Sequence, residues 1–333
     1  MKGQIFRDLV SNKDEPLSIF GTVNAYSSIL AKNSGVKSIY LSGSGVAASS
    51  FGLPDLGFTK LDDVIEDARR ITTSCDLPLL VDIDTGFGSI KSIQKAIKSL
   101  EKENVAAIHI EDQVDLKRCG HRPNKKLISI EKMKDRINAA LDARSDQSFV
   151  IMVRSDALAV ENENKLIERI QSYIEIGADM IFPEAITSLE QYKKIVDFSS
   201  VPVLANITEF GKTPLFSKMD LHKAGISMIL YPLSAFRAMS KAAEKIYKEL
   251  VNAESQKNIL NDMQTRDELY YHLSYYISLL REWWKWWFPA AGNRYCDNKV
   301  SLPKHHRFFF FFFPFPVGFD SADLFQLSKK CPT

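Results

Sequence analysis

The sequence predicts a (β/α)8 barrel of the TIM type with additional C-terminal helices. One observation is that eight short apolar runs alternate with longer segments of helical periodicity, as expected of parallel strands covered on both faces. A second is that these runs end in polar or charged residues, and a closed parallel barrel gathers all such ends on one rim. An open doubly wound sheet is the alternative for the alternation, but it would spread these ends along a line.

The predicted strands are rich in β-branched and apolar side chains, and several follow a Gly or Pro. They are the segments 17–24, 38–43, 78–84, 105–112, 149–156, 179–185, 201–208 and 227–233. Between them, the apolar spacing predicts helices at 60–74, 89–103, 129–143, 162–176 and 188–198. After the eighth strand we expect a helix at 234–251 and one or two more within 256–284, with Thr265 as a helix cap.

The composition changes abruptly near residue 281. All four tryptophans lie in WWKWW at 283–287, and a phenylalanine tract broken by prolines follows at 307–319. The tract is too short to span a bilayer. We therefore predict a barrel domain with a helical appendage at 1–280 and a disordered or non-native tail at 281–333. A membrane-surface or partner-binding tail is the alternative interpretation.

The overall composition is that of a soluble globular protein. Apolar residues make up 45% and charged residues 25%, and the net charge of +2 gives no sign of a nucleic-acid-binding face. The four cysteines are scattered without a CxxC pair, which fits a reducing compartment. The N-terminus lacks an export signal, so we expect a cytoplasmic protein that binds neither nucleic acid nor membrane.

Acidic residues suggest a metal site. Asp82 and Asp84 are two apart on one strand and so share a face. Two such carboxylates repel each other unless a cation or a shared proton joins them, and Mg²⁺ prefers oxygen ligands. Glu111, at the end of the next strand, could hold metal-bound water. The alternative is that both aspartates cap the following turn.

Other polar residues at strand ends suggest a carboxylate-binding site. The loop YLSGSGVA at 40–47 offers backbone N–H groups together with Ser42 and Ser44, although it could be a plain tight turn. Glu184 and Asn206 would complete the polar rim. Three arginines are candidates for bidentate carboxylate binding or, alternatively, for surface ion pairs; they are Arg154, Arg237 and Arg266.

Cys119 lies on a loop between predicted strands. Its neighbours supply too few ligands for zinc, and a disulfide has no obvious partner. Lys117, Arg118, His121 and Arg122 surround it with positive charge, which should lower the pKa of the thiol. Such a cysteine is suited to proton transfer or nucleophilic attack.

Motifs spread along the chain add a resemblance. They include LLVDIDTGFG, HIEDQV, KRCGHRPNK (117–125), RSDALAV, FPEAIT, LANITEFG and MQTRDELY. From about residue 5 to 278 the sequence resembles the methylisocitrate lyase branch of the isocitrate lyase/phosphoenolpyruvate mutase superfamily. It departs from the family at Ser44, where glycine is usual, and after Leu280.

The resemblance implies a set of site residues. Mg²⁺ would be bound by Asp82 and Asp84, and by Asp55 and Glu111 through water. The catalytic residues would be Cys119, Tyr40, Glu111 and His121. Contacts to the substrate would come from Ser42, Gly43, Ser44, Gly120, Arg154, Glu184, Asn206, Ile207, Thr208, Arg237 and Arg266. Phe182, Leu230 and Pro232 would make room for a methyl group on the substrate.

The resemblance also implies the reaction. A small tricarboxylate, 2-methylisocitrate, would be cleaved to pyruvate and succinate by an enzyme that forms a homo-oligomer, expected to be a tetramer. Tyr40 is the predicted base, Cys119 the predicted proton donor, and the loop 114–126 would close over the site. Cleavage of isocitrate to glyoxylate and succinate is one alternative. A catalytically impaired barrel that acts as a binding protein is another.

Overall fold

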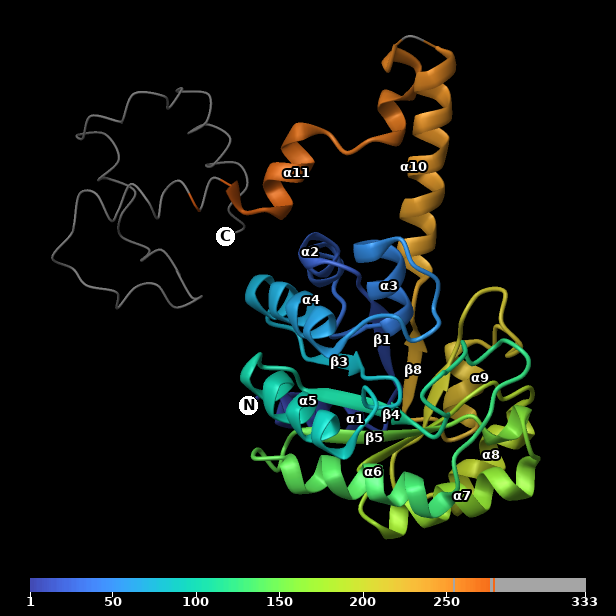
Figure 1. The fold of residues 1–333 in the computed structure, drawn as a ribbon. Coiled ribbons are helices and arrows are strands. Elements are labelled where there is room, and N and C mark those ends of the chain that lie inside the picture. Colours follow the sequence, from blue (N-terminus) through green and yellow to red (C-terminus); the bar gives the residue numbers. More distant parts are fainter. Residues whose placement is uncertain (254, 276–277, 279–333) are drawn as a thin grey trace, which may run out of the picture. The chain divides into compact units, whose positions relative to one another are not determined.

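The computed structural model describes residues 1–253, 255–275 and 278 of the 333 (Figure 1). These fall into two units, the first spanning Met1–Asp262 and the second beginning at Met263. The predicted tail at 281–333 lies outside the described residues. Among the helices that are described, none has the length and apolar character needed to cross a bilayer.

The first unit is a closed barrel of eight parallel strands with helices around it (Figure 1). The strands are β1 (Leu17–Gly21), β2 (Ser38–Leu41), β3 (Leu79–Asp82), β4 (Ala107–Glu111), β5 (Val150–Ser155), β6 (Met180–Pro183), β7 (Leu204–Asn206) and β8 (Met228–Tyr231). β8 pairs with both β1 and β7, and a bridge between Ile181 and Val203 joins β6 to β7. The predicted barrel is confirmed, and an open sheet is excluded because its two edge strands would be unpaired.

Helices follow the strands around the barrel. They are α1 (Lys2–Ser11), α2 (Ala25–Asn33), α3 (Gly43–Phe51), α4 (Leu61–Ser74), α5 (Ile90–Lys102), α6 (Ile130–Ala143), α7 (Glu163–Glu175), α8 (Leu189–Phe198), α9 (Lys218–Lys223) and α10 (Ser234–Asn252), with short 3₁₀ turns η1 (Ala157–Ala159) and η2 (Lys257–Asp262). The five helices predicted between strands are α4 to α8, each within one residue of the expected bounds.

Local capping explains several helix starts. The side chains of Ser89, Ser129, Asn162 and Ser188 each accept a hydrogen bond from the third helical N–H of α5, α6, α7 and α8. In the second unit, Thr265 caps α11 (Arg266–His272) with a complete capping box, as its position predicts.

Two apolar layers stabilise the barrel. One lies between strands and helices, and the other fills the barrel interior, where Ile19, Leu80 and Met152 are buried. α1 closes the amino end of the barrel, because Phe6 and Val10 pack into the inner layer. With this end filled by side chains, the barrel has its accessible face at the carboxyl ends of the strands.

Candidate active site

Asp82 and Asp84 converge on one point of the barrel mouth. The backbone N–H of Gly43 donates to Asp82 Oδ2 at 3.0 Å. A Cβ atom built on Gly43 would lie 3.0 Å from Asp84 Oδ1 and 3.2 Å from Asp82 Oδ2. The two carboxylates therefore face the same small space, and glycine keeps it open. The same contact means that the Gly43 N–H, expected to hold a substrate carboxylate, is already taken by Asp82.

These residues fit a hydrated divalent cation. Within the part of the chain that the structure describes, no three His, Cys, Asp or Glu side chains form a metal cluster. Mg²⁺ does not require one, since it usually takes one or two carboxylates and keeps several waters. Glu111 Oε1 is buried without a hydrogen-bond donor. Asp84 Oδ1 and Glu111 Oε2 are buried beside cationic side chains, 2.6 Å from Lys117 Nζ and 3.2 Å from Arg154 Nη1. These oxygens could bind the ion or its water shell alongside or in place of those cations.

Lys117 supplies the nearest positive charge to this acidic pair. Its buried Nζ lies 2.5 Å from Asp55 Oδ1 and 2.6 Å from Asp84 Oδ1. Burial raises the pKa of Asp84 to about 6, helped by the charges of Asp82 and Asp55 against the opposing effect of Lys117. Burial also acts on Asp82, but nearby cations outweigh it and lower its pKa to about 2. The pair thus divides into one strongly ionised carboxylate and one that holds its proton more tightly.

A cavity of about 410 Å³ opens beside Asp84 and Lys117. Its lining includes Thr85, Phe87 and Asp115, from the segments that follow β3 and β4. The volume is within the range of small-molecule sites.

Tyr40 lies directly beneath the acidic pair. Its hydroxyl is 2.9 Å from His109 Nε2 and 3.3 Å from Asp82 Oδ2. Burial lowers the pKa of His109 to about 4, so the ring is neutral. Burial and the charge of Asp82 raise the pKa of Tyr40 well above its usual range. Tyr40 thus retains its proton, which is unfavourable for the predicted role as a base unless that proton passes to His109.

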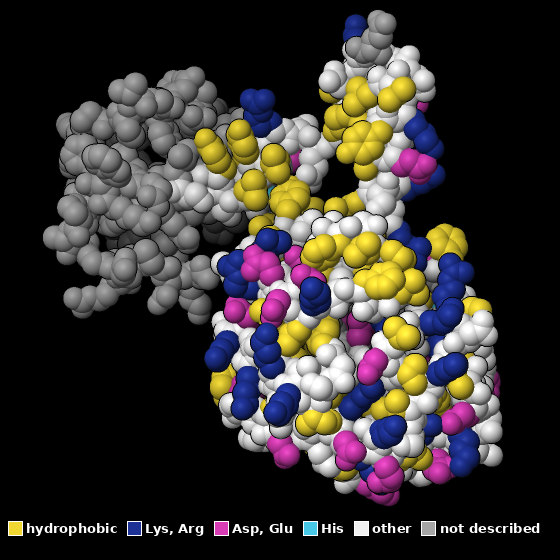
Figure 2. Space-filling view, viewed as in Figure 1, with side chains coloured by type: hydrophobic (Ala, Val, Ile, Leu, Met, Phe, Trp, Pro, Cys, Tyr) yellow, Lys and Arg dark blue, Asp and Glu magenta, His cyan; other side chains and the backbone are white. Residues whose placement is uncertain are grey.

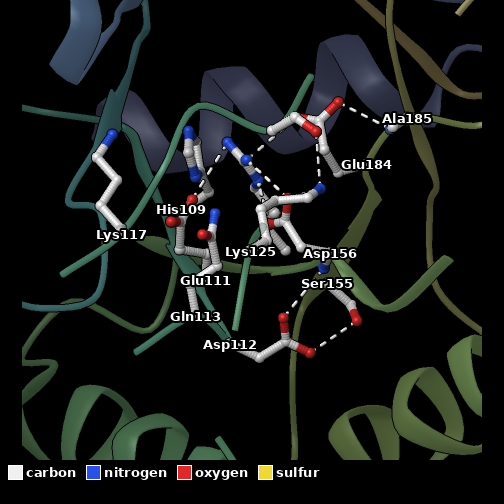
Figure 3. Close-up of polar contacts among 12 residues, drawn as sticks. His109, Glu111, Asp112, Gln113, Lys117, Lys125, Ser155, Asp156, Glu184 and Ala185 are labelled. Carbon is white, nitrogen blue, oxygen red and sulfur yellow. Dashed lines mark hydrogen bonds and ion pairs between the residues drawn. The ribbon is translucent and has the colours of Figure 1, made fainter. Parts of the chain in front are cut away.

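Arg154 joins three acidic residues at the rim. The three, Glu111, Asp156 and Glu184, are labelled in Figure 3. The guanidinium of this arginine lies 3.2 Å from Glu111, 3.0 Å from Asp156 and 3.3 Å from Glu184. Burial raises the pKa of Glu111 well above its usual range. Burial opposes ionisation of Glu184 too, but Arg154 and His121 hold its pKa well below that range. The structure therefore brings together the predicted residues Glu111, Arg154 and Glu184.

The segment Cys119–His121 covers Arg154 and its acidic partners. A Cβ atom on Gly120 would come within 2.5 Å of both Arg154 Nη2 and Glu184 Cγ, so only glycine allows so close an approach. His121 Nε2 lies 3.2 Å from Glu184 Oε1, and its Nδ1 accepts a hydrogen bond from the Lys212 N–H at 3.0 Å. The loop that carries Cys119 thus rests on the barrel rim.

The predicted lowering of the Cys119 pKa is wrong. Burial raises the pKa of the thiol, although a hydrogen bond from the His121 backbone acts in the opposite direction. The positively charged residues next to Cys119 in sequence are directed to other partners or to solvent. Lys117 pairs with aspartates, His121 pairs with Glu184, and Arg118 is exposed. A protonated thiol is suited to donating a proton rather than to nucleophilic attack.

The other predicted site residues differ in how they contribute. Ser42 and Thr208 are buried near strand ends, and Ser44 is half-buried. Asn206 Nδ2 lies 3.3 Å from Glu184 Oε2. The side chain of Ile207 packs in the outer apolar layer, so the predicted substrate contact there would have to come from its backbone.

The two other predicted arginines differ from Arg154 in their setting. Arg237, at the start of α10, is 45% exposed in its side chain and lies 3.7 Å from Glu209. Arg266 belongs to the second unit, so the barrel by itself does not bring it to the mouth. The predicted methyl-pocket residues Phe182 and Leu230 lie in the inner apolar layer.

Sequence reasoning missed four buried residues of the mouth. They are His109, Lys125 and Asp156, together with Lys117 in its role as a partner of Asp55 and Asp84. His109 and Asp156 each stand two positions from a predicted residue on or just after a strand, a spacing that could have found them. The two lysines are on an irregular loop and carry no such signal.

The fold and the mouth define a barrel enzyme of the phosphoenolpyruvate mutase type. Residues 6–251 match the family model for phosphoenolpyruvate phosphomutase, so the chain belongs to this family.

Relatives named 2-methylisocitrate lyase are similar over most of the chain. The protein of Salmonella typhimurium is 56% identical over 275 residues, which are 82% of this chain and 93% of the relative. The protein of Vibrio cholerae is 54% identical over 280 residues, 82% of this chain and 91% of the relative. The crystal structure of 2,3-dimethylmalate lyase has a TM-score of 0.80 at 29% identity and covers 91% of this chain and 99% of its own.

Proposed function

We propose that this protein is a divalent-metal-dependent carbon–carbon lyase that cleaves 2-methylisocitrate to pyruvate and succinate. The observation that carries the proposal is the 54–56% identity to relatives named 2-methylisocitrate lyase over 82% of the chain. The barrel mouth supports it, since the loop that carries the protonated thiol of Cys119 also brings Lys117 to within 2.6 Å of Asp84. We propose Mg²⁺ as the metal, because the available ligands are carboxylate oxygens.

Asp82 and Asp84 would hold the metal, with Asp55 and Glu111 holding its waters. When bound, the ion would act as a Lewis acid on the substrate hydroxyl and the adjacent carboxylate. Tyr40 accepts the hydroxyl proton as its own proton moves to His109 Nε2, 2.9 Å away. Breaking the carbon–carbon bond then leaves negative charge on the succinate half.

Residues of the Cys119 loop and of the cluster around Arg154 stabilise and then neutralise that negative charge. The guanidinium of Arg154 and the side-chain N–H donors of Asn206, both beside Glu184, would stabilise the negative charge that develops at the rim. Cys119, whose thiol is protonated, donates its proton to the carbon that has lost its bond. The loop seated on the rim excludes water and protects the intermediate.

Replacing the thiol tests this proposal. The Cys119→Ser variant should lose about 10²- to 10⁴-fold in turnover, the usual contribution of a general acid. Binding of Mg²⁺ and substrate, measured by calorimetry, should remain. Pyruvate release is followed with lactate dehydrogenase and NADH, and isocitrate serves as the competing substrate.

The matched control is Cys75→Ser, which alters a buried thiol in the outer apolar layer. Its turnover should match that of the unmodified protein once both are folded. Near-normal activity of Cys119→Ser would remove this thiol from the mechanism. Faster cleavage of isocitrate than of 2-methylisocitrate would replace the proposed substrate.

We also propose that the enzyme is a homotetramer and that it acts in the cytoplasm. None of the described side chains of α10 is buried, and Tyr247 and Val251 are 70% and 84% exposed. Figure 2 shows hydrophobic side chains gathered along this helix. A second copy of the chain would cover this surface. Light scattering coupled to size exclusion measures the mass in solution, and a monomer would contradict the proposal.

A further inference from the structure

Lys125 is a buried lysine that the mechanism above does not use. Its side chain is 1% exposed, and its Nζ donates to Asp156 Oδ1 at 2.6 Å and to the Gly120 carbonyl at 2.7 Å. We infer that Lys125 is a positioning residue that holds the Cys119–His121 turn in contact with Arg154. The inference rests on the proposed function only in assigning Cys119 a role in turnover.

The base of the loop is held independently of Lys125. The Val114 N–H donates to the Lys126 carbonyl at 3.0 Å. The side chain of Gln113 donates to the Arg118 carbonyl at 2.8 Å and accepts from the Arg118 N–H at 3.0 Å. These bonds hold the base of the loop and the backbone of Arg118. The turn that follows is held by the two ring contacts of His121 described above and by Lys125.

Lys125 makes the bond that reaches this turn from within the loop. It follows Gly120 by five residues, so its side chain folds back across the turn and donates to the Gly120 carbonyl. Gly120 itself lies against Arg154 and Glu184. The position of Cys119, one residue away, is therefore coupled to the ammonium of Lys125.

Asp156 connects the same lysine to the rim of the barrel (Figure 3). Its Oδ1 accepts from Lys125 at 2.6 Å and from Arg154 Nη2 at 3.1 Å, and its Oδ2 accepts from Arg154 Nε at 3.0 Å. One carboxylate thus holds both the loop and the arginine beneath it. The turn and Arg154 are set relative to each other through this shared partner.

Asp156 is in turn fixed from below. Its N–H donates to Asp112 Oδ1 at 3.0 Å. Asp112 Oδ2 accepts from Ser155 Oγ at 2.7 Å and from the Tyr173 hydroxyl at 3.0 Å. Tyr173 is on α7, so the support for the loop extends from a helix on the outside of the barrel. Because Asp156 is held rigidly, Lys125 can fix the position of the turn instead of moving with it.

Removing the ammonium should release the turn while leaving the barrel folded. In a Lys125→Met variant, Asp156 keeps its two hydrogen bonds to Arg154 and is not left as an unpaired buried charge. The Gly120 carbonyl, in contrast, loses its donor. We expect the segment around Cys119 to move away from Arg154 and the Cys119 thiol to become accessible to reagents in solution.

The test measures the reactivity of Cys119 directly. Full-length protein is treated with iodoacetamide, and modification of the Cys119 peptide is followed by mass spectrometry. Lys125→Met should react at least about tenfold faster, the expected effect of losing a hydrogen bond to a charged group. The matched control is Lys126→Met, which changes the exposed neighbouring lysine and should leave the rate unchanged.

Steady-state kinetics provide a second readout. Lys125→Met should lower kcat by about tenfold to a hundredfold, consistent with a lost charge-assisted hydrogen bond. KM should change much less, because the residue touches the loop and not the substrate. Lys125→Arg, which keeps the charge, should restore part of both kcat and the slow alkylation. If Lys125→Met does not fold, Lys125→Gln takes its place.

The outcomes separate this inference from the proposed function. Unchanged alkylation of Cys119 in a folded Lys125→Met variant, even with lowered thermal stability, would show a purely structural lysine and overturn the inference. Alkylation that accelerates in a protein with no activity toward 2-methylisocitrate would support the positioning role and reject the proposed reaction.

Discussion

The amino and carboxyl ends of the barrel differ in what they bury. At the amino end, α1 packs Phe6 and Val10 against apolar residues of the barrel interior. At the carboxyl end, Asp82, Asp84 and Glu111 are buried at or just after strand ends, beside a few cationic side chains in place of apolar ones. The first arrangement lowers the free energy of the folded state, whereas the second raises it unless a cation or ligand compensates.

This difference assigns separate tasks to the two ends. Buried, like-charged carboxylates are poor stabilisers, but they can bind a cation and complement charge that develops during a reaction. The apolar side chains of α1 that close the amino end can do neither. Substitutions should therefore affect activity at one end and stability at the other, and the following changes test how complete that separation is.

The largest effect is expected at the mouth. Asp82→Asn keeps the shape of the side chain but removes a metal ligand, so turnover should fall on the order of 10³-fold, since a metal ion contributes several kcal/mol. Stability in the absence of metal should fall, but much less than when a buried apolar side chain is removed. Relief of the repulsion from Asp84 offsets part of the loss of the cations and backbone N–H donors that hold ionised Asp82. Asp142→Asn, which changes an exposed side chain on α6, is the control and should retain activity. A large loss of stability in Asp82→Asn would contradict the division of tasks.

A stability effect without an activity effect is expected at the closed end. Phe6→Ala removes a fully buried ring and should destabilise the fold by about 3–5 kcal/mol. Turnover per folded molecule at low temperature should match the unmodified enzyme. Phe198→Ala removes a ring that is 54% exposed and should change stability by no more than about 0.5 kcal/mol. Reduced kcat in folded Phe6→Ala would couple the two ends.

A smaller effect is expected from pH at the mouth alone. Asp84 must lose its proton to bind a cation, and its pKa is raised to about 6. The affinity for Mg²⁺ or Mn²⁺ should therefore fall about tenfold for each pH unit below 6 and level off above it. Calorimetric titrations from pH 5 to 8 measure this, and Asp84→Asn should abolish the dependence. A flat profile in the unmodified protein would contradict the raised pKa.

The same shift predicts a change in stability of the metal-free protein. Because the pKa of Asp84 is higher in the folded state than its ordinary value of 3.8, the folded protein binds this proton more tightly. The stabilising contribution of that proton is complete below about pH 4 and is lost as the pH rises to about 6. Urea unfolding at fixed pH values, compared between Asp84→Asn and the unmodified protein, isolates the contribution.

Much of the barrel could be predicted because its signals are local. All eight strands lie inside predicted apolar runs, since a strand buried on both faces leaves a continuous run. The runs were longer than the strands because apolar residues continue into buried loops, as Ile83 and Ile207 do. The segments of α1, α2, α3 and α9 received no prediction; α3 begins Gly-Ser-Gly, and α9 has only six residues.

The candidate site could be predicted only where it depends on strand ends. Glu111, Arg154 and Glu184 lie at the carboxyl ends of β4, β5 and β6, and the parallel pairing of these neighbouring strands brings them together as expected. The environment of Cys119 was predicted in the wrong direction. Adjacent positive residues in the loop are close in sequence, but their charges are directed to other partners.

The sequence by itself determined the periodicity, the barrel and the strand ends that form its mouth, because these depend on which faces of the chain are apolar. Only the tertiary structure decided which charged side chains form ion pairs with each other. Lys117 bridges Asp55 and Asp84, and Lys125 meets Asp156, across distances along the chain that no local pattern records. The physical reason is that electrostatic energies depend on distance in space and on burial, and both exist only once the chain has folded.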